Sequence, residues 1–351
     1  MAVAGSTSVH PASQAQQVAW DSGVAANPEQ VAEGVWAIAS PIPQGSLPAT
    51  LTYVLVSGDG SVHLIDPGWG GEAAMGELER SLGVIGYSLD AVETVIATHF
   101  HPDHLGLCAA VREQVGARII LSSTERAVLA QETAPSRADE LDVPAQLTRW
   151  GVPSDRQDEL LASFGRSAEV DDLEPDLTMQ HGERLPIAEH DLEIIETPGH
   201  TGGHVCLVDH RRHLVYSGDH VLPRIFAGIG LGTLPDTDPL HDYFTSLDRL
   251  APMDDYQVLP GHEFRFIGLE GRREEIVNHH LRRTREVAAL VPTLGDAPVW
   301  EYARRLTWTA GWDGMHDFWL HSALRQTELH KEFVETGRAE RWLSVAASRD
   351  G

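Results

Sequence analysis

The stretch from Thr98 to Gly106 constrains this chain more than any other part of its sequence. It reads THFHPDHLG, so three histidines and one aspartate fall within six positions, directly after the apolar run Val95–Ala97. We expect a strand to end there and the four side chains to share the loop that follows. Neutral imidazoles and carboxylates are ligands for Zn²⁺, Fe and Mn. Alone, the stretch is also compatible with a histidine-rich surface loop.

Four further strand-like runs end in a residue of the same ligand types. Glycine stands directly before three of these residues, which lets the backbone turn tightly and approach an ion closely. Five strand ends tipped with such side chains are what a two-metal site between two sheets requires, so the sequence predicts a metal centre. The runs are Leu192–Ile195 before His200, Leu214–Tyr216 before Asp219, Val258–Leu259 before His262 and Leu64–Ile65 before Asp66.

The order of these motifs resembles that of the metallo-β-lactamase-fold hydrolase superfamily, in its glyoxalase II-like branch, over roughly residues 31–265. The resemblance implies an α+β fold, a four-layer αββα sandwich with a dinuclear metal site along one sheet edge. It also implies a role for each motif residue. His99, His101 and His200 would bind the first ion, Asp103, His104 and His262 the second, Asp219 would bridge them, and Asp66 would orient the ligand loop.

Such a ligand set leaves coordination positions open for water. Two divalent ions about 3.5–4 Å apart lower the pKa of a bridging water towards neutrality, and one of them can polarise a carbonyl. Family members use the ligand at the position of Asp103 to take the proton of the nucleophile, so Asp103 is the expected catalytic residue. Zn²⁺ is the expected ion, with Fe and Mn as alternatives. The expected reaction is hydrolysis of an ester, thioester, lactone, amide or phosphoester.

Departures from known branches narrow this range. Asp219 stands where zinc β-lactamases carry cysteine, Leu222 where quorum-quenching lactonases carry tyrosine, and His101 where flavodiiron enzymes carry glutamate. The run Pro260–Phe264 resembles its glyoxalase II and thioesterase counterpart. We therefore expect a dinuclear thioester or ester hydrolase. Two enzyme alternatives remain open: a lactonase or other hydrolase of the fold, and a persulfide dioxygenase with one Fe(II) on His99, His200 and Asp219. A third is a binding module whose metal cleft has lost activity.

Composition limits the partners. The 351 residues include 52 acidic and 26 basic side chains, a formal net charge of −26. Such a field repels polyanions, which argues against nucleic acid and against anionic membranes. The expected partner is a small-molecule or carrier-bound ester or thioester, and the oligomeric state stays open. No apolar run is long enough to span a membrane, and Cys108 and Cys206 read as small buried hydrophobes. These features favour a cytoplasmic protein.

The chain divides into three parts at the level of sequence. Residues 1–28, rich in Ala, Ser and Gln, read as a flexible tail, residues 29–267 as the sandwich core, and residues 268–351 as a helical, possibly winged-helix-like appendage. Within the core, residues 122–179 form a helical insertion. We expect it to be a lid that turns Trp150, Leu160 and Phe164 towards substrate, with a peripheral helical hairpin as the alternative.

Several polar residues outside the motifs allow two interpretations. Arg272, Arg273, Arg282, Arg283 and Arg285 lie on one expected helix and could grip an acidic group of a carrier, but the more ordinary interpretation is an exposed face paired with glutamates. Arg224 and Arg265 are candidate mouth residues. His220 could contact a developing oxyanion or point into the second sheet, and His204 reads as structural. Trp308, Trp312 and Trp319 read as the core of the appendage.

Overall fold

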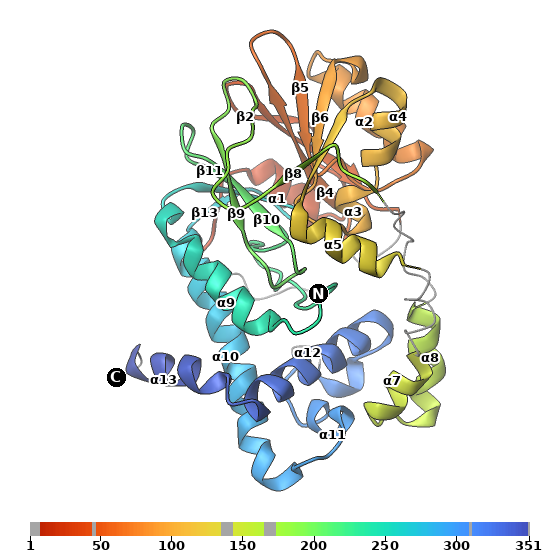
Figure 1. Cartoon of the computed structure of the whole chain (residues 1–351), viewed down its shortest axis with the longest axis vertical. Coiled ribbons are helices and arrows are strands. Elements are labelled where there is room, and N and C mark those ends of the chain that lie inside the picture. The colour runs from red at the N-terminus through yellow and green to blue at the C-terminus, as the bar shows by residue number, and fades with distance from the viewer. Residues whose placement is uncertain (1–7, 44–46, 135–142, 165–172, 309–310, 350–351) are drawn as a thin grey trace.

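Two β-sheets form the upper half of the molecule in the view of Figure 1. The computed structural model describes residues 8–43, 47–134, 143–164, 173–308 and 311–349. In the first sheet, strands β2 to β8 follow one another in chain order; β2 to β5 are antiparallel and β5 to β8 parallel. Its strands are β2 Glu29–Ala32, β3 Val35–Pro41, β4 Ala49–Val56, β5 Val62–Ile65, β6 Val92–Ile96, β7 Arg118–Ser122 and β8 Leu177–Met179.

The second sheet has six strands in the order β1-β13-β12-β11-β10-β9. Only β11 and β12 run parallel, and the other neighbours pair antiparallel. The second sheet therefore pairs residues 10–11, near the start of the chain, with residues 266–267, at the end of the sandwich. Its strands are β1 His10–Pro11, β9 Leu192–Glu196, β10 Val205–Asp209, β11 Leu214–Gly218, β12 Gln257–Pro260 and β13 Phe266–Ile267.

Helices cover the outer face of each sheet, and three apolar clusters fill the spaces between the layers. One cluster joins the first sheet to helices α2 and α4, one lies between the sheets, and one joins the second sheet to α9 and α10. This arrangement confirms the expected four-layer αββα sandwich. The helices are α2 Glu72–Val84, α4 Cys108–Val115, α9 Pro239–Arg249 and α10 Leu269–Leu294, and short 3-10 turns lie at Leu89–Ala91, Ala251–Met253 and Trp312–Gly314.

The sequence explains these elements locally. All eight residues of β4, ATLTYVLV, are buried, as expected for a strand covered on both faces. Helix α9 starts with Asp238, whose side chain accepts a hydrogen bond from His241 N, and with Pro239 in its first turn. Leu240, Tyr243, Phe244 and Leu247 then recur at helical spacing and are all buried against the second sheet.

The expected flexible tail is wrong for residues 8–28. Strand β1 pairs with β13, and α1, Gln14–Asp21, follows with Ser13 as its cap. Gln16 is buried and its Oε1 accepts a hydrogen bond from Arg265 N at 3.0 Å. Ala- and Gln-rich composition is equally typical of a helix, and the partner strand lies some 250 residues further along the chain, beyond any local signal.

The insertion and the C-terminal helices share one apolar core, low in the view of Figure 1. Trp150 and Leu160 of the insertion pack with Trp300, Leu320 and Leu324, so the expectation that they face substrate is wrong. The side chain of Phe164 lies outside the described part of the chain. The helices of this core are α7 Val143–Arg149, α8 Ser154–Phe164, α11 Val299–Ala303 and α12 Asp317–Glu335. Helix α5 Ser123–Glu132 packs on the first sheet, and α13 Ala339–Arg349 packs in the cluster of the second sheet.

The C-terminal region differs from expectation in two details. Residues 268–308 and 311–349, as described, are helical and contain no winged helix, and α12 runs without a break from Asp317 to Glu335, with Thr327 Oγ1 donating to Ala323 O inside it. Trp319 is 53% exposed rather than part of a core. None of the described helices is long and apolar enough to cross a membrane.

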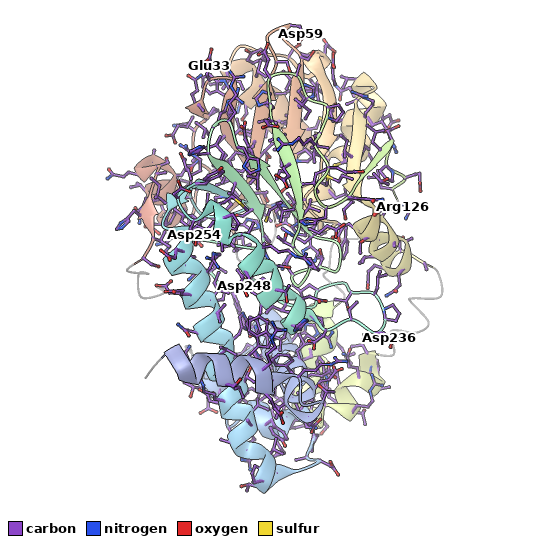
Figure 2. All side chains as sticks on the ribbon, turned by 60° about the vertical axis from the view of Figure 1, so that its left-hand side comes forward. Glu33, Asp59, Arg126, Asp236, Asp248 and Asp254 are labelled. Atoms are coloured by element: carbon purple, nitrogen blue, oxygen red, sulfur yellow. The ribbon has the colours of Figure 1, made fainter. Side chains whose placement is uncertain are left out.

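Exposed acidic side chains occur at several separate places on the sandwich. Figure 2 labels Asp59 at the β4–β5 turn, Glu33 at the β2–β3 turn, Asp236 before α9 and Asp248 on α9, which lie in separate parts of the ribbon. These acidic side chains therefore do not gather in one patch. Cys108 and Cys206 are both free and buried, as expected.

Candidate metal centre

The candidate ligands all lie beyond the ends of strands, at one edge of the two sheets. His99 and His101 follow β6, His200 follows β9, Asp219 follows β11 and His262 follows β12. Asp103 and His104 belong to the short helix α3, Pro102–Leu105. Strands β5 and β6, and β11 and β12, run parallel. Parallel neighbours end at the same sheet edge, so chain segments more than 150 residues apart meet there.

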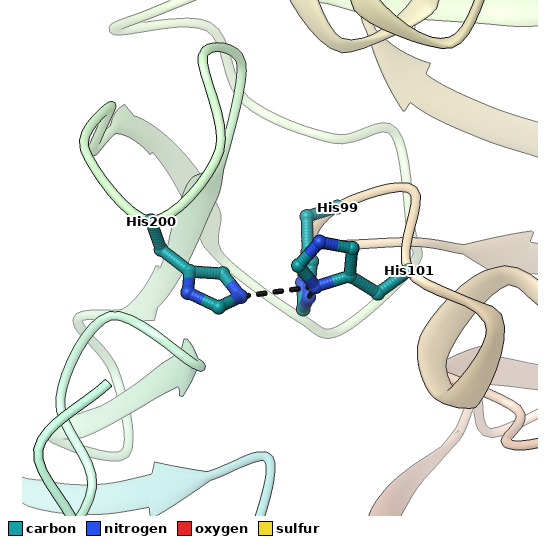
Figure 3. A group of neighbouring side chains, drawn as sticks. All are labelled: His99, His101 and His200. Atoms are coloured by element: carbon teal, nitrogen blue, oxygen red, sulfur yellow. Dashed lines mark hydrogen bonds between the residues drawn. The ribbon is translucent and has the colours of Figure 1, made fainter. Parts of the chain in front are cut away.

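His99, His101 and His200 form the first group (Figure 3). His101 Nδ1 lies 3.0 Å from His99 Nε2 and 3.1 Å from His200 Nε2. Burial lowers the pKa of all three imidazoles, to about 3 for His101. All three are therefore neutral at pH 7, which is the form that binds a metal ion.

The outer nitrogen of each of these rings has its own neighbour. His200 Nδ1 donates to Gly228 O at 2.7 Å and His101 Nε2 donates to Leu231 O at 3.1 Å. His99 Nδ1 lies 3.0 Å from Thr98 Oγ1. These contacts fix the orientation of each ring and leave the inner nitrogen free to bind a cation.

Asp103, His104 and His262 form the second group. Asp103 Oδ2 lies 3.2 Å from His262 Nε2 and 3.8 Å from His104 Nε2. The outer nitrogen of His262 donates to Ala49 O at 2.9 Å, and that of His104 lies 2.8 Å from Asp66 Oδ2. The inner nitrogens of both histidines thus face the carboxylate of Asp103.

Asp219 lies between the two groups. Its Oδ1 is 3.5 Å from His104 Nε2 and 3.4 Å from His262 Nε2, whereas Oδ2 is 3.7 Å from His200 Nε2. Each oxygen therefore faces a different group. The structure thus brings the other six sequence-predicted ligands together with Asp219 in one cluster.

The donor atoms of the second group test whether a cation fits. His104 Nε2, His262 Nε2 and Asp219 Oδ1 are buried and make no hydrogen bond. Burial opposes a charge on His104, but Asp66, Asp103 and Asp219 raise its pKa to about 9, and carboxylates likewise raise the pKa of His262. Buried ligand atoms that make no hydrogen bond, beside buried carboxylates, favour a positive charge between them. A divalent cation would supply it, so the residues fit a metal.

Asp66 connects this site to the end of β5. It is 2% exposed, and its carboxylate accepts hydrogen bonds from Thr98 N and Thr98 Oγ1, both at 2.8 Å, as well as contacting His104. Its φ of 53° lies in the left-handed region, where aspartate is tolerated better than most residues. One carboxylate thus holds the loop before His99 and the ring of His104.

Comparison with known proteins now places the chain in a family. The sequence model of the metallo-beta-lactamase superfamily matches residues 47–262, well over half of the chain and the whole span from β4 to His262. The chain belongs to this superfamily. It is accordingly a metal-dependent hydrolase of the metallo-β-lactamase fold.

Individual superfamily members are similar over most of the sandwich. Hydroxyacylglutathione hydrolase GloC of Haemophilus influenzae is 29% identical over 224 residues, which cover 61% of this chain and 86% of that protein. Acyl-coenzyme A thioesterase MBLAC2 of Bos taurus is 28% identical over 183 residues, 50% of this chain and 57% of that protein. A metallo-beta-lactamase family protein of Thermus thermophilus has a similar structure, with a TM-score of 0.72, 28% identity, and coverage of 88% of this chain and 95% of that one.

Five of the seven arginines expected at the mouth or on a carrier grip are engaged elsewhere, whereas Arg282 and Arg285 are exposed. Arg224 pairs with Glu263 and Asp21, and Arg265 pairs with Glu29. Arg272 is buried and donates to Leu222 O and Ile225 O, both at 2.7 Å. In the same way, Arg273 pairs with Asp254 and Arg283 donates to Thr307 O. These five side chains bind groups of the protein itself and hold loops in place, so they are not available to an acidic group of a substrate.

Two histidines near Asp219 have different surroundings. His204 Nε2 accepts a hydrogen bond from Asp219 N at 3.2 Å, and its Nδ1 lies 2.8 Å from Thr197 Oγ1. His204 therefore holds the backbone of Asp219, as a structural residue would. His220 is fully buried with its ring centroid 4.8 Å from that of Tyr243, on α9. The ring of His220 thus packs towards the helix layer.

Sequence reasoning missed Glu125, which is fully buried beside the first group. Its only sequence signal is the pattern Ser122-x-x-Glu125, which marks a helix start and does not indicate a contact with the metal loops. Ser122 does cap α5, accepting a hydrogen bond from Glu125 N at 3.0 Å. The glutamate carboxylate, however, turns away from the helix to the metal loops.

Proposed function

We propose that the chain is a dinuclear metal hydrolase of thioesters or related esters, with His99, His101 and His200 at one ion, Asp103, His104 and His262 at the other, and Asp219 shared. The observation that carries this proposal is the completeness of the second group beside the first, with Asp219 directing one oxygen to each. A mononuclear iron enzyme would leave the second group without a role. Zn²⁺ is the proposed ion, since imidazole and carboxylate ligands suit it.

Each residue around the ions then has a chemical task. When bound, two divalent cations lower the pKa of water towards neutrality and polarise a carbonyl. Asp103, 16% exposed at its side chain, is the most accessible carboxylate in contact with His262 and the one we assign to accept the proton of the attacking water. Asp66 keeps the Nε2 of His104 directed inward, and the carbonyls of Gly228 and Leu231 do the same for His200 and His101.

The substrate class rests on the superfamily members that the chain resembles. One cleaves hydroxyacylglutathione and another cleaves acyl-coenzyme A, so a thioester is the bond that the two named activities share. The substrate is a small molecule or carrier-bound acyl group. Because the described arginines Arg272, Arg273 and Arg283 are engaged with the protein itself, recognition of an acidic carrier would need other groups.

The test combines metal content with turnover. Protein purified without added metal should carry two ions per chain and should hydrolyse an acyl-coenzyme A or a hydroxyacylglutathione. Asp103→Asn should lower kcat by about 10²-fold or more, as removal of a general base does. One iron per chain with oxygen consumption on a persulfide, and no thioester cleavage, would replace this proposal with the dioxygenase.

A further inference from the structure

The carboxylate of Glu125 joins the two loops that carry the first histidine group. Its Oε1 accepts hydrogen bonds from Phe100 N at 2.9 Å and from Thr201 Oγ1 at 2.7 Å, and its Oε2 accepts one from Gly203 N at 2.7 Å. Phe100 lies between the candidate ligands His99 and His101, and Thr201 directly follows His200. The two oxygens of one carboxylate thus bind both loops.

The contact between these segments is close as well as polar. A Cβ added at Gly203 would lie 2.1 Å from Glu125 N and 2.5 Å from its Cα, so only glycine fits there. Ser122 Oγ donates to Gly203 O at 2.6 Å, which fixes the same peptide from its other side. The start of α5 and the His200 loop are therefore locked together, and Glu125 extends that lock to the His99 loop.

The three donors at Glu125 are neutral groups, and the carboxylate is completely buried. A buried carboxylate is costly unless hydrogen bonds or opposite charges compensate it, so the three hydrogen bonds hold the carboxylate in this position. Two of its partners are backbone N–H groups in loops that have no strand pairing of their own. An amide cannot replace the carboxylate here, because an NH₂ group cannot accept from the N–H groups that point at it.

We propose that Glu125 is a positioning residue for the three-histidine ion: it sets the distance between the His99–His101 loop and the His200 loop, and so the affinity of that ion. The inference rests on the ligand set of the proposed function. It assigns the residue no contact with substrate.

The test measures Co²⁺ binding to the full chain, without substrate. Glu125→Gln should lower affinity for one of two ions about 10–100-fold, the range for groups that orient ligands, and should change the Co²⁺ absorption of that ion. Thr201→Val, which removes one donor and leaves the carboxylate, should give a smaller loss of the same ion. Glu113→Gln, an exposed change on α4, is the control and should bind two ions normally.

Combined variants separate positioning from a general loss of stability. In a His262→Ala background, Glu125→Gln should remove the remaining tightly bound ion, whereas in a His200→Ala background it should change nothing further. Equal losses in both backgrounds would mean that Glu125 only stabilises the fold, and wild-type affinity in Glu125→Gln would also overturn its role.

The variant His200→Ala distinguishes an error in the proposed ligand set from an error in the role of Glu125. If His200→Ala alone keeps both ions at wild-type affinity, the ligand set of the proposed function is wrong, and the role of Glu125 is lost with it. If His200→Ala loses one ion but Glu125→Gln loses none, the ligand set stands and only the positioning role is wrong.

Discussion

Asp66 carries three contacts on one buried carboxylate, two with Thr98 and one with His104. In Asp66→Asn the amide nitrogen must face either Thr98 or the ring of His104, so one contact is lost. We expect the affinity for the second ion to fall about 10–100-fold with the fold intact. Competition with a chelator would measure it, and an unchanged affinity would reduce Asp66 to a turn residue.

Asp219 is the residue whose loss should affect both ions. Its oxygens face His104 and His262 on one side and His200 on the other. Asp219→Ala should therefore lose more metal than any single histidine-to-alanine change, as elemental analysis of purified variants would show. Full occupancy in Asp219→Ala would contradict its position between the ions.

The sequence revealed the candidate ligands because each stands at a strand end beside a turn residue, which is a local pattern. Glu125 and Arg272 have no such pattern. Each is an ordinary charged residue on a helix whose role depends on backbone groups in distant loops, Phe100 and Gly203 for one and Leu222 and Ile225 for the other. Those partners become neighbours only in the folded chain.

Among the elements, the helices of the insertion show that the spacing of apolar residues predicts a helix but not the element against which it packs. The spacing of apolar residues correctly predicts helices at α5, α7 and α8, and it predicts that each has an apolar face. It does not name the partner of that face. For α7 and α8 the partner is α11 and α12, about 150 residues later, whereas Val128 and Leu129 of α5 pack into the apolar cluster of the first sheet.

Trp150 is the side chain that should matter most to this shared core. It is 1% exposed, and its Nε1 donates to Glu328 Oε1 at 2.7 Å. Trp150→Ala should lower the free energy of unfolding by about 3–5 kcal/mol while leaving metal content unchanged, since no candidate ligand lies in these helices. Denaturant unfolding would measure it, with the exposed Leu161→Ala as control. A cost below about 1 kcal/mol would contradict the shared core.

Across the whole molecule, four histidines of α10 and α12, two buried and two half-buried, link stability to pH. Burial lowers the pKa of His279 to about 3 and of His321 to about 4, and it also holds the pKa values of His280 and His330 well below the usual range. The folded state therefore requires neutral rings. Its stability is complete above the unfolded pKa of about 6.5 and is lost as pH falls towards the folded values.

We expect the metal-free protein to lose about 1–2 kcal/mol per such histidine between pH 7.5 and pH 5. Urea unfolding at the two pH values would measure the loss, and His321→Gln should reduce it by about one histidine's share. Equal stability of the wild-type protein at both pH values would show that these rings are accessible to protons in the folded state.

The pairing of β1 with β13 has a consequence for synthesis on the ribosome. Residues 10–11 emerge early, but their partners at residues 266–267 emerge last of all the strands. His99, His101, Asp103 and His104 likewise wait for His200 and His262. At about 5–20 residues per second, the nascent chain exposes half of an ion-binding site for on the order of ten seconds. The first sheet can form in that interval, whereas the metal centre and the N-terminal strand are completed only as synthesis passes residue 267.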